Sequence, residues 1–295
     1  MQVSFMIGEF LALFASFCWA LAAVLYKKVL ENKGYFIVNL FRVAFASTFL
    51  AFILLFINIQ SLILTRTELI LFSFAALNGP VIGDTLYFIG LKQIGVSRTQ
   101  SISSSYPLFS MILAAIFLHE KLNLAILIAT PLIVAGIILV LPIENKTQSN
   151  NIHSFFAFTP ILTAFFWSIS LITFKFILNN SSINPIFATF LNRTLSLPFL
   201  SFTVAATKEL SQMKNLNKID IIYMAVAGII SLGIGGICIF LSLSLLNASK
   251  AIPLSSISPF FAIILAFIYT KEKLNIKILF GTTFIVTGII LLTFY

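Results

Sequence analysis

The sequence predicts an all-α membrane protein with ten transmembrane helices, arranged as two inverted five-helix repeats. Of its 295 residues, 60% are hydrophobic and 9% are charged, whereas soluble domains contain about 45–50% apolar and about 25% charged residues. Ten spans of roughly 20 residues use about 200 residues, which leaves only short loops. A third observation is an internal duplication, described below. The composition excludes a soluble globular protein, a disordered chain and a nucleic-acid-binding protein.

Ten apolar blocks follow one another along the chain, separated by short polar clusters such as 31–34 and 119–121. Each block is long enough to cross a hydrocarbon core about 30 Å thick as a helix. Strands of a membrane barrel would alternate apolar and polar residues, and the run from Ile133 to Val140 does not. The predicted helices cover about 5–28, 36–59, 68–91, 98–118, 122–142, 153–178, 184–206, 219–245, 250–270 and 274–295.

The two halves of the chain resemble each other. Residues 103–123 repeat as residues 255–275 at an offset of 152, with 12 identities in 21 positions. Trp19 and Lys27 recur, again eight residues apart, as Trp167 and Lys175. We therefore predict a first repeat at 1–142, a linker at 143–152 and a second repeat at 153–295.

An odd number of helices per repeat makes the two copies cross the membrane in opposite senses. Inverted repeats of this kind are typical of secondary transporters, whose substrate site lies near the midplane between the halves. The duplication therefore predicts a transporter that works by alternating access.

The duplication, the Trp19 and Lys27 pattern, and the blocks 107–120 and 259–272 resemble the drug/metabolite transporter superfamily. They are most similar to its ten-helix members with two EamA domains. The resemblance implies export or exchange of small metabolites, often amino acids. It also implies a central cavity walled largely by the predicted helices at 68–91, 98–118, 219–245 and 250–270, with 5–28 and 153–178 contributing.

Asp84 is the acidic residue deep in an apolar block, and such residues usually face the interior of a helix bundle. It forms a structural ion pair with Arg42 or Arg193, binds a substrate ammonium group or a coupling proton, or lies at a helix end near water. The repeat aligns Asp84 with Gly236, so the carboxylate is not shared by both halves. For this reason we expect Asp84 to matter more to transport than to folding.

Arg193, beside Asn192, is a second candidate because a guanidinium fork suits the carboxylate of a substrate; Arg42 takes a similar place in the first half. Snorkelling to the membrane surface is the alternative for these cations. The further candidates are hydroxyl-rich helix starts, a Gly/Pro interruption and aromatic residues able to contact a substrate. They are Ser104, Tyr106, Ser256, Ser258, Asn78, Trp19, Trp167 and Tyr87.

Glu120 and Glu272 lie between apolar blocks and are expected to cap helices or form salt bridges. The residues suggest no catalytic, metal or cofactor motif, so an enzyme is not expected. The expected partners are a small-molecule substrate and the lipid bilayer, with protons as a candidate coupling ion and a monomer as the candidate assembly. A lipid flippase or an accessory membrane subunit is the alternative function.

The orientation is predicted differently by two arguments. Lys and Arg number 12 in the loops on one side and 4 on the other, which by the positive-inside rule places both termini outside. The family resemblance implies cytoplasmic termini, and this second orientation is the one we expect, in a multi-pass protein of the cell membrane.

Overall fold

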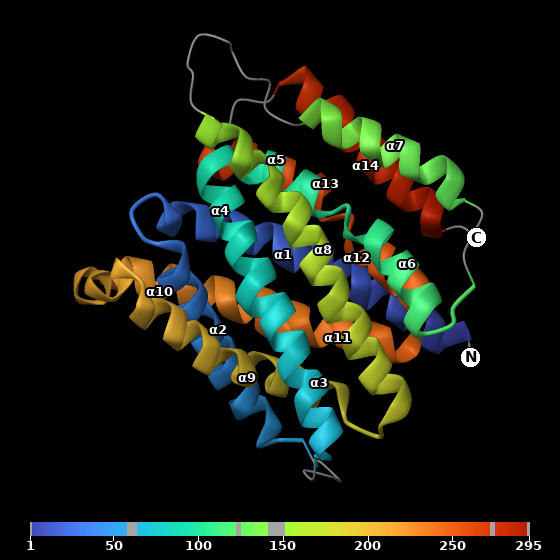
Figure 1. Cartoon of the computed structure of the whole chain (residues 1–295), viewed down its shortest axis with the longest axis horizontal. Coiled ribbons are helices and arrows are strands. Elements are labelled where there is room, and N and C mark those ends of the chain that lie inside the picture. The colour runs from blue at the N-terminus through green and yellow to red at the C-terminus, as the bar shows by residue number, and fades with distance from the viewer. Residues whose placement is uncertain (1, 58–63, 122–124, 141–150, 272–274, 294–295) are drawn as a thin grey trace.

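The computed structural model of the chain is built from helices throughout the residues that it describes, which are 2–57, 64–121, 125–140, 151–271 and 275–293 (Figure 1). The helices of the first half are α1 (Gln2–Leu30), α2 (Tyr35–Leu54), α3 (Arg66–Ala76), η1 (Leu77–Gly83), α4 (Asp84–Ile94), α5 (Val96–Ser103), α6 (Tyr106–Phe117) and α7 (Ile126–Val140). Those of the second half are α8 (Asn151–Asn180), α9 (Pro185–Ala206), η2 (Lys208–Asn215), α10 (Lys218–Gly228), η3 (Ile229–Ile234), α11 (Gly235–Leu245), α12 (Ala248–Ser255), α13 (Ser258–Leu265), η4 (Ala266–Thr270) and α14 (Ile276–Thr293).

Seven helical segments in the described part of the chain are long and apolar enough to cross a membrane. Two shorter apolar helices lie within α7 and α14. α9 is 22 residues long and has the polar pair Asn192 and Arg193 near its middle. The chain is therefore a multi-pass membrane protein. Each predicted block corresponds to one of these segments to within a few residues, while most of the predicted linker lies outside the described residues.

Four of the spans are interrupted where the sequence places Gly, Pro or Ser. η1 is a π-helical turn around Pro80, whose ring nitrogen has no N–H to donate, and the Asp84 N–H bonds to the carbonyl of Gly79, five residues back. η3 is the corresponding π-helical turn in the second half. The α5–α6 break at 104–105 and the α12–α13 break at 256–257 lie within the hydroxyl-rich segments that the sequence had suggested as helix starts.

Local features recur at the offset of 152 seen in the sequence. Thr65 and Glu68 form a capping box at the start of α3, and Asn217 and Asp220 form another at the start of α10. η1 and η3 begin 152 residues apart, as do the left-handed residues His119 and Lys271, with φ of 53° and 54°. Residues aligned at this offset therefore adopt the same local backbone structure in both halves, even where the residue types differ.

The helices pack so that each half contributes to the centre. α1 packs against α11, and α8 packs against α4 and η1, so each of these long helices contacts the interrupted span of the other half. α2 packs against α9, while α7 and α14 lie side by side at the edge of the molecule (Figure 1). An added Cβ on Gly136 of α7 would lie 2.5 Å from the carbonyl oxygen of Gly281 in α14, which shows how closely this pair approaches.

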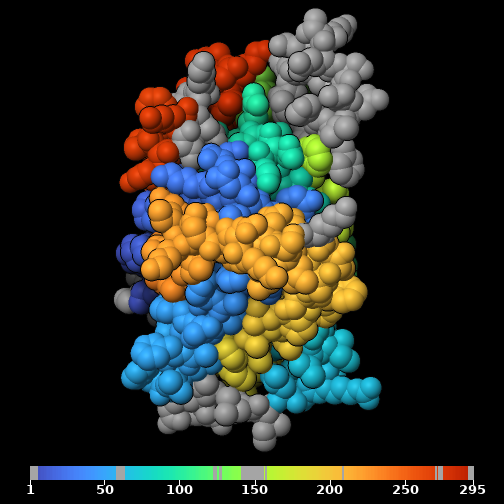
Figure 2. Space-filling view, turned by 90° about the vertical axis from the view of Figure 1, so that its left-hand side faces the viewer, coloured from blue at the N-terminus to red at the C-terminus, as the bar shows by residue number. Residues whose placement is uncertain are grey.

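Polar contacts join the two halves at both ends of the bundle. At one end η2 lies across the turn between α1 and α2, and Figure 2 shows its gold and orange surface beside the blue surface of the first half. There Glu209 Oε2 accepts from the Ile37 N–H at 3.0 Å, at the start of α2. At the other end the Glu120 carboxylate accepts from the N–H groups of Ala248 and Ser249 at 3.0 and 2.9 Å. Glu120 therefore caps α12, as the sequence predicted, while Glu272 lies outside the described residues.

Candidate functional site

A cavity of about 100 Å³ lies at the centre of the bundle, between the two halves. Its wall comes from α1, α2, η1, α4, α5, α6, α8, α9, η3, α11 and α13. The lining residues are Trp19, Tyr26, Arg42, Gly79, Pro80, Asp84, Tyr87, Gln100, Tyr106, Trp167, Ser170, Leu171, Arg193, Ser231, Leu232, Ile239, Phe240 and Ser258.

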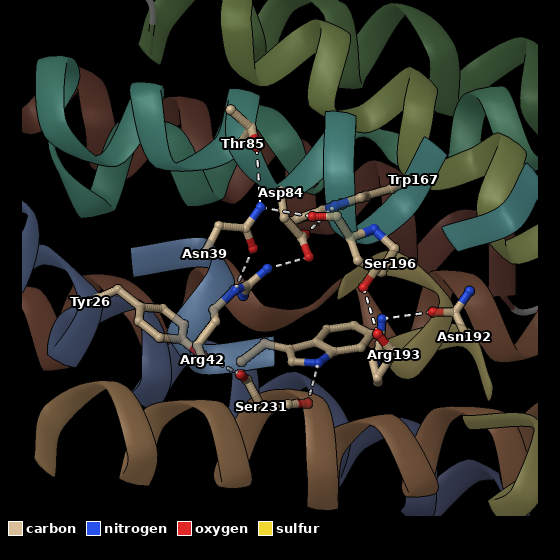
Figure 3. Close-up of polar contacts among 12 residues, drawn as sticks. Tyr26, Asn39, Arg42, Asp84, Thr85, Trp167, Asn192, Arg193, Ser196 and Ser231 are labelled. Carbon is tan, nitrogen blue, oxygen red and sulfur yellow. Dashed lines mark hydrogen bonds and ion pairs between the residues drawn. The ribbon is translucent and has the colours of Figure 1, made fainter. Parts of the chain in front are cut away.

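Asp84 is the first residue of α4, immediately after the π-helical turn. The backbone stays helical through this junction, since Gly83 has φ of -58° and ψ of -49° and the Asp84 N–H bonds to the Gly79 carbonyl. Its Oδ2 forms an ion pair with Nη2 of Arg42, and its Oδ1 accepts from Nε1 of Trp167 at 2.8 Å (Figure 3). The carboxylate is thus held by one residue from each half of the chain.

Arg42 borders the cavity, and its side chain is held by partners from the first half. Its Nε donates to Oδ1 of Asn39 at 3.0 Å, and its guanidinium lies 4.4 Å from the ring centre of Phe88. Asn39 in turn donates to the carbonyl oxygen of Pro80 at 2.8 Å, which ties the network to the π-helical turn. The arrangement is that of a buried, hydrogen-bonded ion pair, which is one of the alternatives that the sequence left open for Asp84.

Arg193 occupies the equivalent place in α9 with fewer partners. It is 7% exposed, and its Nη1 donates to Oδ1 of Asn192 at 2.9 Å. Its Nε has no hydrogen-bond partner, and no carboxylate of the described residues lies within 4.0 Å of it. The guanidinium lies 5.7 Å from the ring centre of Phe240. The cavity thus contains one partnered and one incompletely partnered guanidinium.

Aromatic side chains form much of the remaining wall. Trp19 Nε1 donates to the carbonyl oxygen of Ser231 at 3.2 Å, and Tyr26 shares a 2.7 Å hydrogen bond with the hydroxyl of the same serine. The rings of Tyr87 and Tyr106 lie 5.1 and 6.0 Å from that of Trp167. These rings can pack against the apolar part of a small ligand.

Hydroxyl and amide groups from the broken spans meet at another side of the cavity. Gln100 accepts a hydrogen bond from the hydroxyl of Tyr87 and donates from Nε2 to Oγ of Ser258 at 2.6 Å. The hydroxyls of Ser104 and Ser258 lie 3.2 Å apart. The breaks at 104–105 and 256–257 therefore bring polar groups of both halves together.

Seven of the eleven residues singled out from the sequence line the cavity. They are Trp19, Asp84, Tyr87, Tyr106, Trp167, Arg193 and Ser258. The other four are buried within the bundle but are not part of the lining. Asn192 bonds Arg193, Ser104 bonds Ser258, Asn78 donates to the Phe74 carbonyl, and Ser256 donates to the Pro253 carbonyl.

The lining also contains Arg42, which the sequence had suggested beside Arg193, and residues that the sequence did not single out, chiefly Tyr26, Gln100 and Ser231. α2 and α9 contribute their arginines, although the family resemblance implied walls from the other spans. The similar places of Arg42 and Arg193 in the two halves were the signal that pointed to both arginines, because equivalent residues of an inverted repeat face the same axis. For Gln100 and Ser231 no pattern in the sequence marked the inward face.

The electrostatic balance of the lining is positive. Arg42 and Arg193 carry two positive charges and Asp84 carries one negative charge, while the other lining side chains are neutral types. Among the described residues no group of three or more His, Cys, Asp or Glu side chains could hold a metal ion.

Known proteins resemble this chain along its whole length. The profile of the EamA-like transporter family matches residues 6–141 and 154–294. A protein of Archaeoglobus fulgidus named "Uncharacterized transporter" is 28% identical over 288 residues, which cover 97% of this chain and 98% of that protein. A crystal structure with 14% sequence identity superposes with a TM-score of 0.66, covering 99% of this chain and 96% of the other, and shows likeness of fold.

Proposed function

The chain belongs to the EamA-like transporter family, and we propose that it is a secondary transporter that exports or exchanges small polar metabolites, with amino acids among the candidates. The observation that carries this proposal is the central cavity, whose charged and aromatic wall comes from both halves of the chain. A site shared by two repeats can open to either side when the halves rearrange, which is the requirement of alternating access.

We further infer that the ten helical segments all cross the membrane as two inverted units, 1–142 and 153–295. The matching capping boxes, π-helical turns and left-handed residues support this division. One chain supplies both sides of the cavity, so a monomer contains a complete site.

The substrate, in this proposal, lies between the aromatic residues and the two arginines. Trp19, Tyr87, Tyr106 and Trp167 would pack against its body, while Asp84, Arg193 and Ser258 would face its polar groups. Asn192, Ser104, Asn78 and Ser256 would act through their hydrogen bonds to the wall. A proton gradient is the proposed driving force to test first.

The size of the cavity favours a small solute over a lipid. An enclosed cavity of about 150 Å³ binds benzene, and this one is about 100 Å³. The two guanidinium groups and the carboxylate in the wall favour a charged solute over a lipid, and family membership favours transport over catalysis.

The test is uptake and efflux in vesicles that contain the purified protein, measured against a panel of amino acids and organic acids with and without a proton gradient. Arg193→Gln alters the cavity, and Arg66→Gln removes an exposed charge at the start of α3 as the matched control. We expect exchange of at least one solute, retained in Arg66→Gln and reduced in Arg193→Gln. Equal fluxes in protein-containing and protein-free vesicles for every solute would contradict the proposal.

A further inference from the structure

We propose that Arg193 is the anion-binding residue of the central cavity, and that it takes a carboxylate of a small organic acid that carries a net negative charge. The inference rests on the proposed transport function for its physiological meaning, but the binding site can be tested without transport.

The first support is the incomplete set of partners around Arg193. A guanidinium has five N–H donors, and the only hydrogen bond of this side chain among the described residues is the one from Nη1 to Asn192. The side chain is 93% buried and Nε has no partner. Among the described residues no carboxylate pairs with this guanidinium within 4.0 Å. A buried charge without a directly paired counter-ion is unfavourable, so the site is suited to an anion supplied from outside.

The second support is the broken symmetry between the halves. Arg42 and Arg193 take similar places in α2 and α9, but the carboxylate that pairs with Arg42 is Asp84, and the residue that the offset of 152 matches to Asp84 is Gly236. An added Cβ on Gly236 would lie 3.4 Å from Nη2 of Arg193 and 4.0 Å from its Nε. The position where a protein carboxylate would neutralise Arg193 is therefore occupied by a residue without a side chain.

The third support is the charge of the whole cavity. Two guanidinium groups and one carboxylate give a net charge of +1, which a monoanion neutralises and a zwitterion does not. Asp84 already accepts from Arg42 and Trp167. The ammonium group of an amino acid would have to compete with Arg42 for this carboxylate, whereas a carboxylate on Arg193 displaces nothing.

The surroundings of Arg193 limit the rest of the ligand. Phe240 lies against the guanidinium, and hydroxyls of Ser231 and Ser258 line the same cavity. With a volume of about 100 Å³, the cavity suits an organic acid with a short apolar or hydroxylated body rather than a bulky drug.

The decisive experiment supplies the missing carboxylate from the protein. Gly236→Asp places a carboxylate next to Arg193, and Gly236→Ala is the uncharged control. The added Cβ of either variant would lie 3.2 Å from Cγ2 of Thr189, so both variants make the same tight contact. The full-length protein in detergent is titrated with acetate, lactate and glutamate, and with the matched amides acetamide, lactamide and glutamine. Ligand-induced thermal stabilisation is measured at constant ionic strength.

We expect at least one carboxylate to stabilise the protein at a concentration at least tenfold lower than its amide. Gly236→Asp and Arg193→Gln should each remove this preference, while Gly236→Ala should retain it. Gly236→Asp keeps Arg193 in place, so the test holds even if Arg193→Gln does not fold. Equal effects of acids and amides, no effect of any acid, or loss of the preference in Gly236→Ala would overturn the proposal.

Exchange assays in vesicles separate this inference from the transport function. Exchange of neutral or zwitterionic solutes with no preference for carboxylates would reject the anion site and leave transport standing. Carboxylate binding that Gly236→Asp abolishes, without exchange of any solute, would support the anion site and reject transport.

Discussion

Replacing Asp84 with asparagine removes the charge of the carboxylate but retains an acceptor for the indole of Trp167. The variant leaves the Arg42 guanidinium, whose side chain is 4% exposed, without its counter-ion. Removing one partner of a buried ion pair costs about 3–5 kcal/mol. Asn39 and the ring of Phe88 still contact Arg42, so some of its interactions remain.

A loss of this size should be visible in the melting temperature of the purified protein. The shift is about 2–4 °C per kcal/mol for chains of 150–250 residues and smaller for longer ones, so in this chain of 295 residues Asp84→Asn should lower the melting temperature by roughly 5–10 °C. The double variant Arg42→Gln/Asp84→Asn removes both charges and should recover most of the loss. Glu9→Gln is the matched control, because the Glu9–Lys250 pair is 34% and 30% exposed and such pairs contribute about 0–1 kcal/mol.

The opposite result would support a role of Asp84 in transport, which the sequence suggested because the second repeat has Gly236 at the matching position. If Asp84→Asn melts within about 2 °C of the unaltered protein and loses transport, the carboxylate acts on the substrate or a proton. Failure of the double variant to recover stability would also refute the ion-pair reasoning, because a neutral pair leaves no uncompensated charge.

Two further predictions concern contacts away from the ion pair. Lys175 donates from Nζ to two carbonyls at the end of α11, at 2.7 and 3.0 Å, so Lys175→Met should cost about 1–3 kcal/mol and lower the melting temperature without changing ligand affinity. Gly228 lies against the backbone of Arg42, whereas Gly233 lies against the flexible side chain of Phe49. Gly228→Ala should therefore destabilise by about 1–3 kcal/mol, measured as melting temperature, and more than Gly233→Ala; equal losses would contradict this reading of the packing.

The positions of the helices could be predicted because they depend on local sequence features, namely the length of each apolar block and the residues that interrupt it. Apolar length sets each span, and Pro80 and the Ser-rich segments mark where spans are interrupted. The π-helical form of η1 and η3 was not predictable in detail, because it depends on how the backbone accommodates its neighbours. An added Cβ on Gly79, for example, would meet Oγ of Ser170 in α8.

The wall of the cavity was less predictable, because hydropathy does not identify which side of an apolar helix faces the centre. Asn192 and Arg193 are adjacent in α9, yet only Arg193 lines the cavity. Tyr26 is next to Lys27, which the repeat had marked, but Lys27 bonds the carbonyls of Leu91 and Lys92 at the end of α4 instead. A one-residue difference on a helix changes direction by about 100°, which composition cannot resolve.

The duplication explains why both halves have an arginine at the cavity, while the proposed anion site depends on a position at which the halves differ. The repeat gives each half an arginine facing the centre, but only the first half supplies an acid to neutralise it. Two neutralised arginines would leave a cavity without net charge, and two free ones would favour dianions. With Asp84 in one half and Gly236 in the other, a single positive charge remains, and in our proposal this loss of symmetry at one pair of positions sets the charge of the ligand that fits.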